Sequence, residues 1–162
     1  MITRILVAID FSPQADTALA CARGIAREFG ATLHLLHVLD NVFLRAMASD
    51  PRDLETAALR QLDERLTAED RRLGAVATLE KSDEPAKEIL QYAGEAAIDL
   101  IVMGTHGRTG LRHVLVGSVA ERVVQRARCP VLTIRDPHVA ADVTGERHVH
   151  SHTRSNGFQR AV

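Results

Sequence analysis

Short apolar runs alternate with longer amphipathic stretches along residues 1–135 of the 162-residue chain. The short runs are rich in Ile, Leu and Val with few polar interruptions, as is typical of strands buried on both faces. The longer stretches repeat apolar residues at helical spacing. The pattern predicts strands at residues 2–9, 31–39, 75–79, 99–103 and 130–134 and helices at residues 13–29, 52–73, 85–97 and 118–127. This alternation favours one α/β domain with a mostly parallel sheet and helices on both faces.

Residues with strong preferences for helix ends mark the first helix. Ser12 is suited to cap its start, Pro13 favours the first helical position and Gly30 is suited to end it. Gly74 is expected to end the long helix at residues 52–73 in the same way. The first helix carries an apolar stripe that we expect to face the sheet, formed by Ala15, Ala18, Leu19, Ala22, Ile25, Ala26 and Phe29.

Beyond residue 135 the pattern stops, and residues 136–162 are polar with little periodicity. We therefore expect a folded domain at residues 1–135 and a disordered tail at residues 136–162. His148, His150 and His152 alternate within that tail, so an extended chain would gather them on one face around a metal ion. A solvated tail without metal is the simpler interpretation.

Cysteine usage and hydropathy indicate the compartment. Cys21 and Cys129 are the two cysteines, which suits buried thiols in a reducing cytoplasm better than a disulfide framework. No apolar stretch approaches the roughly 20 residues that cross a bilayer, and no secretory leader is recognisable. We expect a cytoplasmic protein without a membrane partner.

Charge and aromatic content argue against further partners. The chain has 20 basic and 21 acidic residues with a net charge of -1, so no overall field favours nucleic acid or an anionic membrane. Aromatic residues make up only 3% of the chain, and tryptophan is absent, which argues against stacking platforms for single strands. We expect no nucleic-acid partner.

A glycine-rich stretch after the fourth predicted strand carries the strongest functional signal. Its glycines and final serine, Gly104, Gly107, Gly117 and Ser118, follow the spacing G-x2-G-x9-G-S. Glycine backbone can approach a ligand closely, and the free amides at the start of the last predicted helix favour a phosphate. Ser118 is suited both to cap that helix and to donate its hydroxyl to an anion. The alternative is a plain turn followed by an ordinary cap.

Familiar nucleotide and hydrolase motifs are missing from the sequence. It contains neither G-x4-G-K-[ST] nor, after the first strand, G-x-G-x-x-G. It also lacks G-x-S-x-G, H-E-x-x-H and a paired acidic ligand motif. Ser118, His106 and Asp10 are near enough in the expected topology to form a catalytic group, but a serine at a helix start is usually structural. We therefore assign no catalytic residue.

Five ordered segments make residues 1–135 resemble the universal stress protein family, and the glycine spacing resembles its ATP-binding subgroup. The matching segments are Arg4-Ile5-Leu6-Val7-Ala8-Ile9-Asp10-Phe11-Ser12, Leu36-His37-Val38, Asp99-Leu100-Ile101-Val102-Met103-Gly104, the glycine-rich stretch, and Cys129-Pro130-Val131-Leu132-Thr133-Ile134. The resemblance implies an adenine nucleotide alpha hydrolase-like fold, a five-stranded parallel sheet in the order 3-2-1-4-5. Ligands of such sheets bind where neighbouring strands lead to opposite faces.

The resemblance also implies a set of nucleotide contacts. Adenosine would lie near Ala8 and Asp10, with Val38 against the adenine and Met103 adding apolar contact. Ribose and phosphates would be held by Gly104, Gly107, Gly117 and Ser118, with further backbone amides from Val119 and Ala120.

Each of these contacts has a structural alternative. Asp10 suits a helix cap, and Val38 and Met103 suit the core. Arg108 and Arg112 in the loop are expected to be solvated, and His106 and His113 are not assigned a role. His34 and His37 on the second predicted strand are interpreted as hydrogen-bonded core or edge residues.

The resemblance therefore predicts an ATP-binding stress protein that acts as a nucleotide-responsive binding module, with Mg²⁺ as a possible companion of the phosphates near Asp10. It also implies a homodimer built on the last strand through Val131, Leu132, Thr133 and Ile134. Two alternatives stay open: a weak ATPase or nucleotidyl-transfer enzyme that uses the same cleft, and an interaction protein of the same fold that binds no nucleotide.

Overall fold

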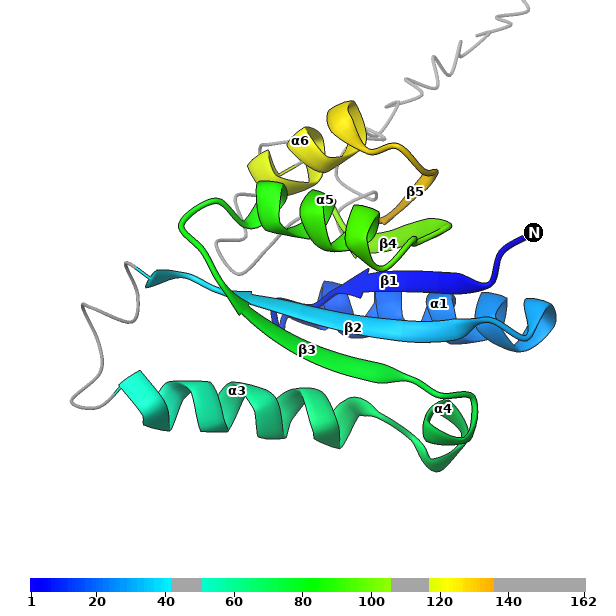
Figure 1. Cartoon of the computed structure of the whole chain (residues 1–162), viewed down its shortest axis with the longest axis horizontal. Helices are drawn as coiled ribbons and strands as arrows, with labels where there is room; N and C mark the ends of the chain where they lie inside the picture. The colour runs from blue at the N-terminus through cyan, green and yellow to red at the C-terminus, as the bar shows by residue number, and fades with distance from the viewer. Residues whose placement is uncertain (42–50, 106–116, 136–162) are drawn as a thin grey trace, which may run out of the picture.

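A computed structural model of the chain describes residues 1–41, 51–105 and 117–135. Its described part holds a five-stranded sheet in which every pair of neighbours is parallel, in the order β3-β2-β1-β4-β5 (Figure 1). The strands are β1 Arg4–Ala8, β2 Thr32–Leu39, β3 Val76–Lys81, β4 Leu100–Gly104 and β5 Val131–Ile134. The predicted α/β class, parallel sheet and strand order are confirmed.

Helices cover both faces of this sheet, as predicted. They are α1 Pro13–Phe29, α3 Pro51–Arg65, α4 Ala68–Arg72, α5 Pro85–Glu95 and α6 Ser118–Arg126. In Figure 1, α5 lies in front of the sheet and α1 behind it. Within the described ranges, no helix has both the length and the apolar character that crossing a bilayer requires.

Alternation along each strand divides the interior into two cores. Ile5 and Val7 of β1 point toward α1 and α3, where they pack with Leu62 of α3. Leu6 of β1 points the other way and packs with Ile89 of α5 and with α6. Because successive strand side chains face opposite sides, a continuous apolar run supplies both cores at once.

Helix α1 begins and ends as the sequence predicts, with one exception along its stripe. The Ser12 hydroxyl accepts a hydrogen bond from the Ala15 amide at 3.2 Å, and Gly30 closes the helix in the left-handed region at a φ of 64°. Phe29, however, leaves 54% of its surface exposed, so its assignment to the buried stripe is wrong. Phe29 is exposed because it is the last residue of the helix, directly before the chain turns back toward β2.

The single long helix predicted at residues 52–73 is also wrong, because two helices occupy that stretch. Helix α3 ends at Arg65, and Thr67 caps the start of α4. The Thr67 hydroxyl accepts from the Asp70 amide at 3.1 Å, while the Asp70 carboxylate accepts from the Thr67 amide at 2.9 Å. This reciprocal capping box gives two backbone donors side-chain partners and starts a new helix. The predicted tail, with its three histidines, lies outside the described residues.

Candidate functional site

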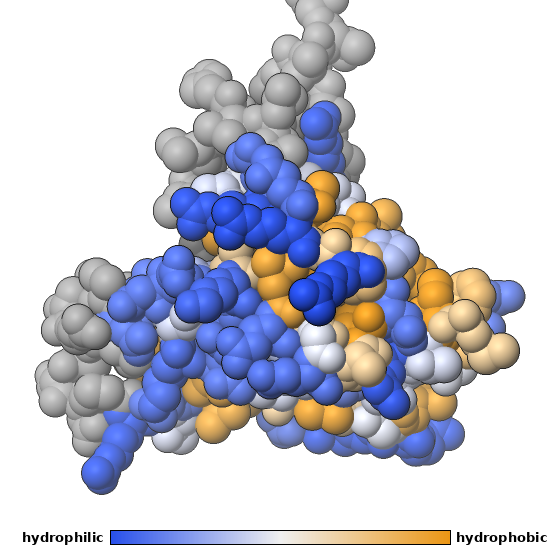
Figure 2. Space-filling view, turned by 45° about the horizontal axis from the view of Figure 1, so that its top comes forward, coloured by the Kyte–Doolittle hydropathy of each residue, from blue (hydrophilic) through white to orange (hydrophobic). Residues whose placement is uncertain are grey.

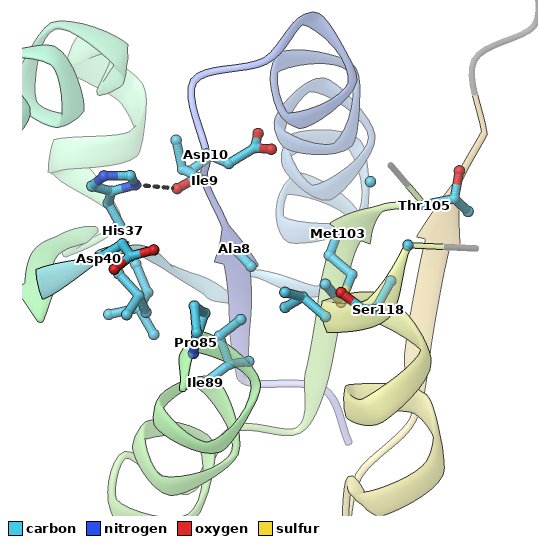
Figure 3. Close-up of a pocket in the computed structure, with 16 residues that line it drawn as sticks. Ala8, Ile9, Asp10, His37, Asp40, Pro85, Ile89, Met103, Thr105 and Ser118 are labelled. Atoms are coloured by element: carbon cyan, nitrogen blue, oxygen red, sulfur yellow. Dashed lines mark hydrogen bonds between the residues drawn. The ribbon is translucent and has the colours of Figure 1, made fainter. Parts of the chain in front are cut away.

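A cavity of about 380 Å³ opens at the carboxyl ends of β1, β2 and β4 (Figure 3). Helix α5 contributes Pro85 and Ile89 to its wall, and the start of α6 contributes residues 117–120. A volume of this size is within the range of about 300–1,000 Å³ that small-molecule sites occupy. The cavity lies where β1 leads to α1 on one face of the sheet and β4 leads toward α6 on the other, which is the usual ligand position in such sheets.

Every predicted contact residue within the described ranges lines this cavity: Ala8, Asp10, Val38, Met103, Gly104, Gly117, Ser118, Val119 and Ala120. The sheet register explains how distant segments meet, since Ala8 lies opposite Leu36 on one side and Met103 on the other. Gly107, together with the loop residues His106, Arg108, Arg112 and His113, lies outside the described residues. The roles of all these residues toward a nucleotide stay predictions.

One wall of the cavity is apolar. Leu36, Ile89 and Met103 each expose 5% of their surface or less, and Val38 is half-buried beside them. Val38 and Met103 pack in the core beneath α5 and α6 and line the cavity as well, so the two interpretations of these residues are compatible. A planar apolar group would bury its surface against this wall.

The start of α6 supplies hydrogen-bond donors on the opposite side. Gly117 caps the helix with extended backbone, donates its own amide to the Thr105 carbonyl at 2.6 Å, and accepts from Glu121 at 2.9 Å. Ser118 is therefore the first helical residue, and its assignment as the cap is wrong. The amides of Ser118, Val119 and Ala120 have no hydrogen-bond partner in the part of the chain that the structure describes. Such a helix start favours an anion.

Acidic side chains complete the cavity wall. Asp10 and Asp40 both line it, whereas no lysine or arginine does so among the described residues. The Asp10 Oδ1 atom accepts from the amide of Ser12 at 3.0 Å and from its hydroxyl at 2.5 Å. Asp10 thus positions the residue that caps α1 rather than capping the helix itself. An anion in this cavity would depend on the backbone dipoles at α6, since nearby side-chain cations are lacking in the described part.

The two strand histidines are hydrogen-bonded, as predicted. His37 is buried, and its Nδ1 donates to the Ile9 carbonyl at 2.6 Å (Figure 3). His34 Nδ1 lies 2.9 Å from the Tyr92 hydroxyl on α5. Burial, with the nearby Arg4 guanidinium adding to it, lowers the pKa of His34. His34 therefore belongs to the packing between β2 and α5.

Sequence reasoning missed several residues of the cavity wall, among them His37, Asp40, Pro85, Ile89 and Thr105. A signal for some of them was available. Asp40 and Thr105 directly follow strands, and Pro85 opens the helix after β3, so their positions in the sequence pointed to the carboxyl edge of the sheet, although no role was predicted for them. Ile89 had no such signal, because it reaches the cavity only through the packing of α5 on the sheet.

Few charged side chains at this site are suited to bind a divalent cation. Asp10 and Asp40 supply the carboxylate oxygens that Mg²⁺ prefers. Among the described residues, no group of three or more His, Cys, Asp or Glu side chains is arranged to hold a metal ion. The residues present therefore fit a cation that arrives with a ligand's phosphates and keeps much of its water.

Comparisons with known proteins agree with this architecture. Residues 1–135 match the Universal stress protein family. The chain is 34% identical over 140 residues to universal stress protein MJ0531 of Methanocaldococcus jannaschii, across 83% of this chain and 82% of that protein.

Solved structures of similar proteins share the fold. Protein MJ0577 of the same organism has a TM-score of 0.71 at 28% identity, covering 84% of this chain and 97% of that one. A universal stress protein from Archaeoglobus fulgidus, solved in complex with dAMP, has a TM-score of 0.57 at 26% identity, covering 83% and 98%. With its sequence match and its sheet order in agreement, the chain belongs to the universal stress protein family.

Proposed function

We propose that this protein binds an adenine nucleotide, ATP included, in the cavity at the carboxyl edge of the sheet and acts as a nucleotide-responsive binding module in a cytoplasmic stress response. The observation that carries the proposal is the pairing, in one cavity, of an apolar wall with helix amides that have no partner among the described residues. A nucleotide has the matching division into a flat base and an anionic phosphate. The dAMP complex of the Archaeoglobus fulgidus relative supports the same ligand class.

The chemistry of the wall suggests how the nucleotide lies. The base would pack against Val38 and Met103, and the ribose would lie near Asp10 and Gly104. Of the Asp10 carboxylate, Oδ1 is engaged by Ser12, and Oδ2 has no partner among the described residues, which leaves it available to accept from a sugar hydroxyl. The phosphates would accept from the amides at the start of α6. This orientation keeps the phosphates away from the carboxylates.

The backbone at the start of α6 supports the phosphate end of this arrangement. Three successive amides from Ser118 to Ala120 and the exposed Ser118 hydroxyl are donors in one place. Gly107 is predicted to add its backbone from the loop. With Mg²⁺ present, the phosphates and water would hold the cation, and Asp10 and Asp40 are the carboxylates of the described cavity wall that would reach it through that water.

Binding is tested by isothermal titration of the purified full chain with ATP, ADP, AMP and adenosine, each with and without Mg²⁺. We expect saturable binding with a stoichiometry of one nucleotide per chain and weaker binding of adenosine than of AMP. Equilibrium dialysis that retains no nucleotide at millimolar concentration would overturn the proposal in favour of an interaction protein. Sustained, Mg²⁺-dependent phosphate release that is lost in Gly117→Val would instead favour the enzyme alternative.

We also propose that β5 forms a homodimer interface. The amides of Ile101 and Thr105 donate to the carbonyls of Pro130 and Ile134, so alternate residues of β5 face β4. By alternation, the backbone groups of Val131 and Thr133 face the outer edge of the sheet. All four residues of the strand are only partly buried. Figure 2 shows hydrophobic residues between the polar ones on the right of the molecule. This edge has no partner strand among the described residues, and such an edge favours pairing with a second chain.

Thr133→Pro tests this interface. Proline removes an outward-facing amide while leaving the bonds between β4 and β5 in place. We expect wild type to sediment as a dimer at micromolar concentration and Thr133→Pro to sediment as a folded monomer. A wild-type monomer at that concentration would contradict the proposal.

A further inference from the structure

We infer that a stack of three side chains, Arg65, Phe11 and His37, positions the wall of the cavity from the opposite face of the sheet. Helix α3, which ends with Arg65, supplies no residue to the described cavity wall. Through this stack, the position of the end of α3 would affect the cavity wall and therefore the affinity for a ligand. The part of this inference that concerns affinity rests on the proposed nucleotide binding.

The three groups form a continuous column. The rings of Phe11 and His37 have centroids 4.3 Å apart and are tilted by 41°. The Arg65 guanidinium carbon lies 5.0 Å from the centre of the Phe11 ring. A guanidinium at this distance over an aromatic face is attracted by the ring quadrupole. The column thus connects α3, the turn after β1, and β2.

Phe11 has an unusual backbone for a residue of its size. Its φ is 64°, in the left-handed region, where a bulky side chain is strained. Such a conformation persists only where the surroundings hold it in place. The ring contacts His37 and the Arg65 guanidinium and also packs against the hydrophobic core beneath α1 and α3.

Direct bonds connect the column to the cavity. His37 donates to the Ile9 carbonyl at 2.6 Å, and the Ile9 amide donates to Leu36 at 2.8 Å. Asp10, between Ile9 and Phe11 in sequence, lines the cavity. In Figure 3 the His37 ring lies beside Ile9, and the Asp10 side chain extends away from that ring. Asp10 therefore lies in a turn whose neighbouring residues, Ile9 and Phe11, are both in contact with the column.

Arg65 is itself held firmly enough to act on the turn. Its Nε donates to Asp16 of α1 at 2.7 Å, and its Nη1 donates to the Gln61 carbonyl at 3.1 Å. The Arg65 side chain is 21% exposed, so solvent does not surround it. The last turn of α3, the first turn of α1 and Phe11 consequently share one guanidinium group.

The test compares Arg65→Met with a matched control, Arg60→Met. Arg60 lies on the same helix, and its side chain is 78% exposed and pairs with Glu64. Hydrogen exchange of the Ser12 amide, which donates to Asp10, reports the order of the turn without any nucleotide. Titration with AMP reports the effect on the cavity.

We expect Arg65→Met to speed Ser12 exchange and to raise the Kd for AMP by about threefold to tenfold, the range that a partly buried cation–π contact supports. Arg60→Met should match wild type in both measurements. Asp16→Asn removes the ion pair but leaves the guanidinium over Phe11, so its effect should be clearly smaller. Core amides such as that of Val7 should exchange at the wild-type rate, which separates positioning of the turn from general destabilisation.

Two results would overturn the inference: unchanged Ser12 exchange in Arg65→Met, or an Asp16→Asn variant that reproduces the whole effect. Faster Ser12 exchange with an unchanged Kd would overturn the link to the cavity. If wild type binds no AMP, the proposed function fails, while the exchange measurement still decides whether the stack holds the turn. Phe11→Leu, which keeps apolar bulk but removes the aromatic face, should behave like Arg65→Met.

Discussion

Replacing Ser118 by proline removes one backbone donor from the cavity without weakening helix α6. Ser118 is the first helical residue, and its amide has no hydrogen-bond partner in the described structure. Proline is favoured at this position because its missing amide would be unpaired anyway. The preceding residue, Gly117, has a φ of -67° and a ψ of 152°, which suits a residue before proline. The substitution therefore fits the existing backbone.

The expected loss of affinity follows from the bond removed. A hydrogen bond to a charged group contributes about 1.5–3 kcal/mol, which corresponds to about a tenfold to hundredfold change in Kd. Ser118→Ala removes only the hydroxyl, so the difference between Ser118→Pro and Ser118→Ala measures the amide. Adenosine, which has no phosphate, should bind all three proteins equally.

Isothermal titration with AMP and adenosine, together with urea unfolding, decides this prediction. We expect Ser118→Pro to unfold within about 0.5 kcal/mol of wild type, because the site is exposed and the backbone is compatible. Equal AMP affinity in Ser118→Pro and Ser118→Ala would refute the assignment of the phosphate to the start of α6. An equal loss for adenosine and AMP would refute it as well, since the amide would then act on another part of the ligand.

Two further predictions concern the α1 and α3 side of the sheet. Leu62 is fully buried, so Leu62→Ala should lower the free energy of unfolding in urea by about 2–5 kcal/mol. Leu59→Ala, at a site that is 46% exposed, should have little effect. Similar losses in the two variants would contradict the packing of Leu62 between α3 and the sheet. Burial raises the pKa of Asp70, but hydrogen bonds from Thr67 and the Arg23 guanidinium outweigh it and leave that pKa lowered. A carboxylate with a lowered pKa stabilises the fold above its unfolded pKa of about 3.9. The stability difference between wild type and Asp70→Asn, measured by urea unfolding, should thus be largest near neutral pH and shrink as the pH falls below about 3.9. A difference in urea midpoints that does not change with pH would contradict the lowered pKa of Asp70.

Local patterns in the sequence were sufficient to predict most of the helices and strands. Ile5, Leu6 and Val7 form an unbroken apolar run because both faces of β1 are covered, and such runs identify central strands of a parallel sheet. Ser12 and Gly30 mark the ends of α1 through preferences that act within a few residues. These features are predictable because their physical causes lie close together in the chain.

The errors have equally local explanations. The amphipathic period runs past Arg65, so periodicity alone predicts one helix where the structure has two. Thr67 and Asp70 have the spacing of a capping box, and that signal was present in the sequence. Ser118 looked like a cap by residue type, but the glycine before it takes that position.

The sequence by itself determined the α/β class, the glycine and serine residues at the start of α6, and, through family resemblance, the strand order. Only the tertiary structure decided which other groups reach the cavity, such as Ile89 of α5, and that Arg65 lies over Phe11 against His37. Periodicity and capping act between near neighbours in the chain, whereas these contacts join residues on separate elements. They exist only after the sheet order and the packing of α3 and α5 have brought those elements together.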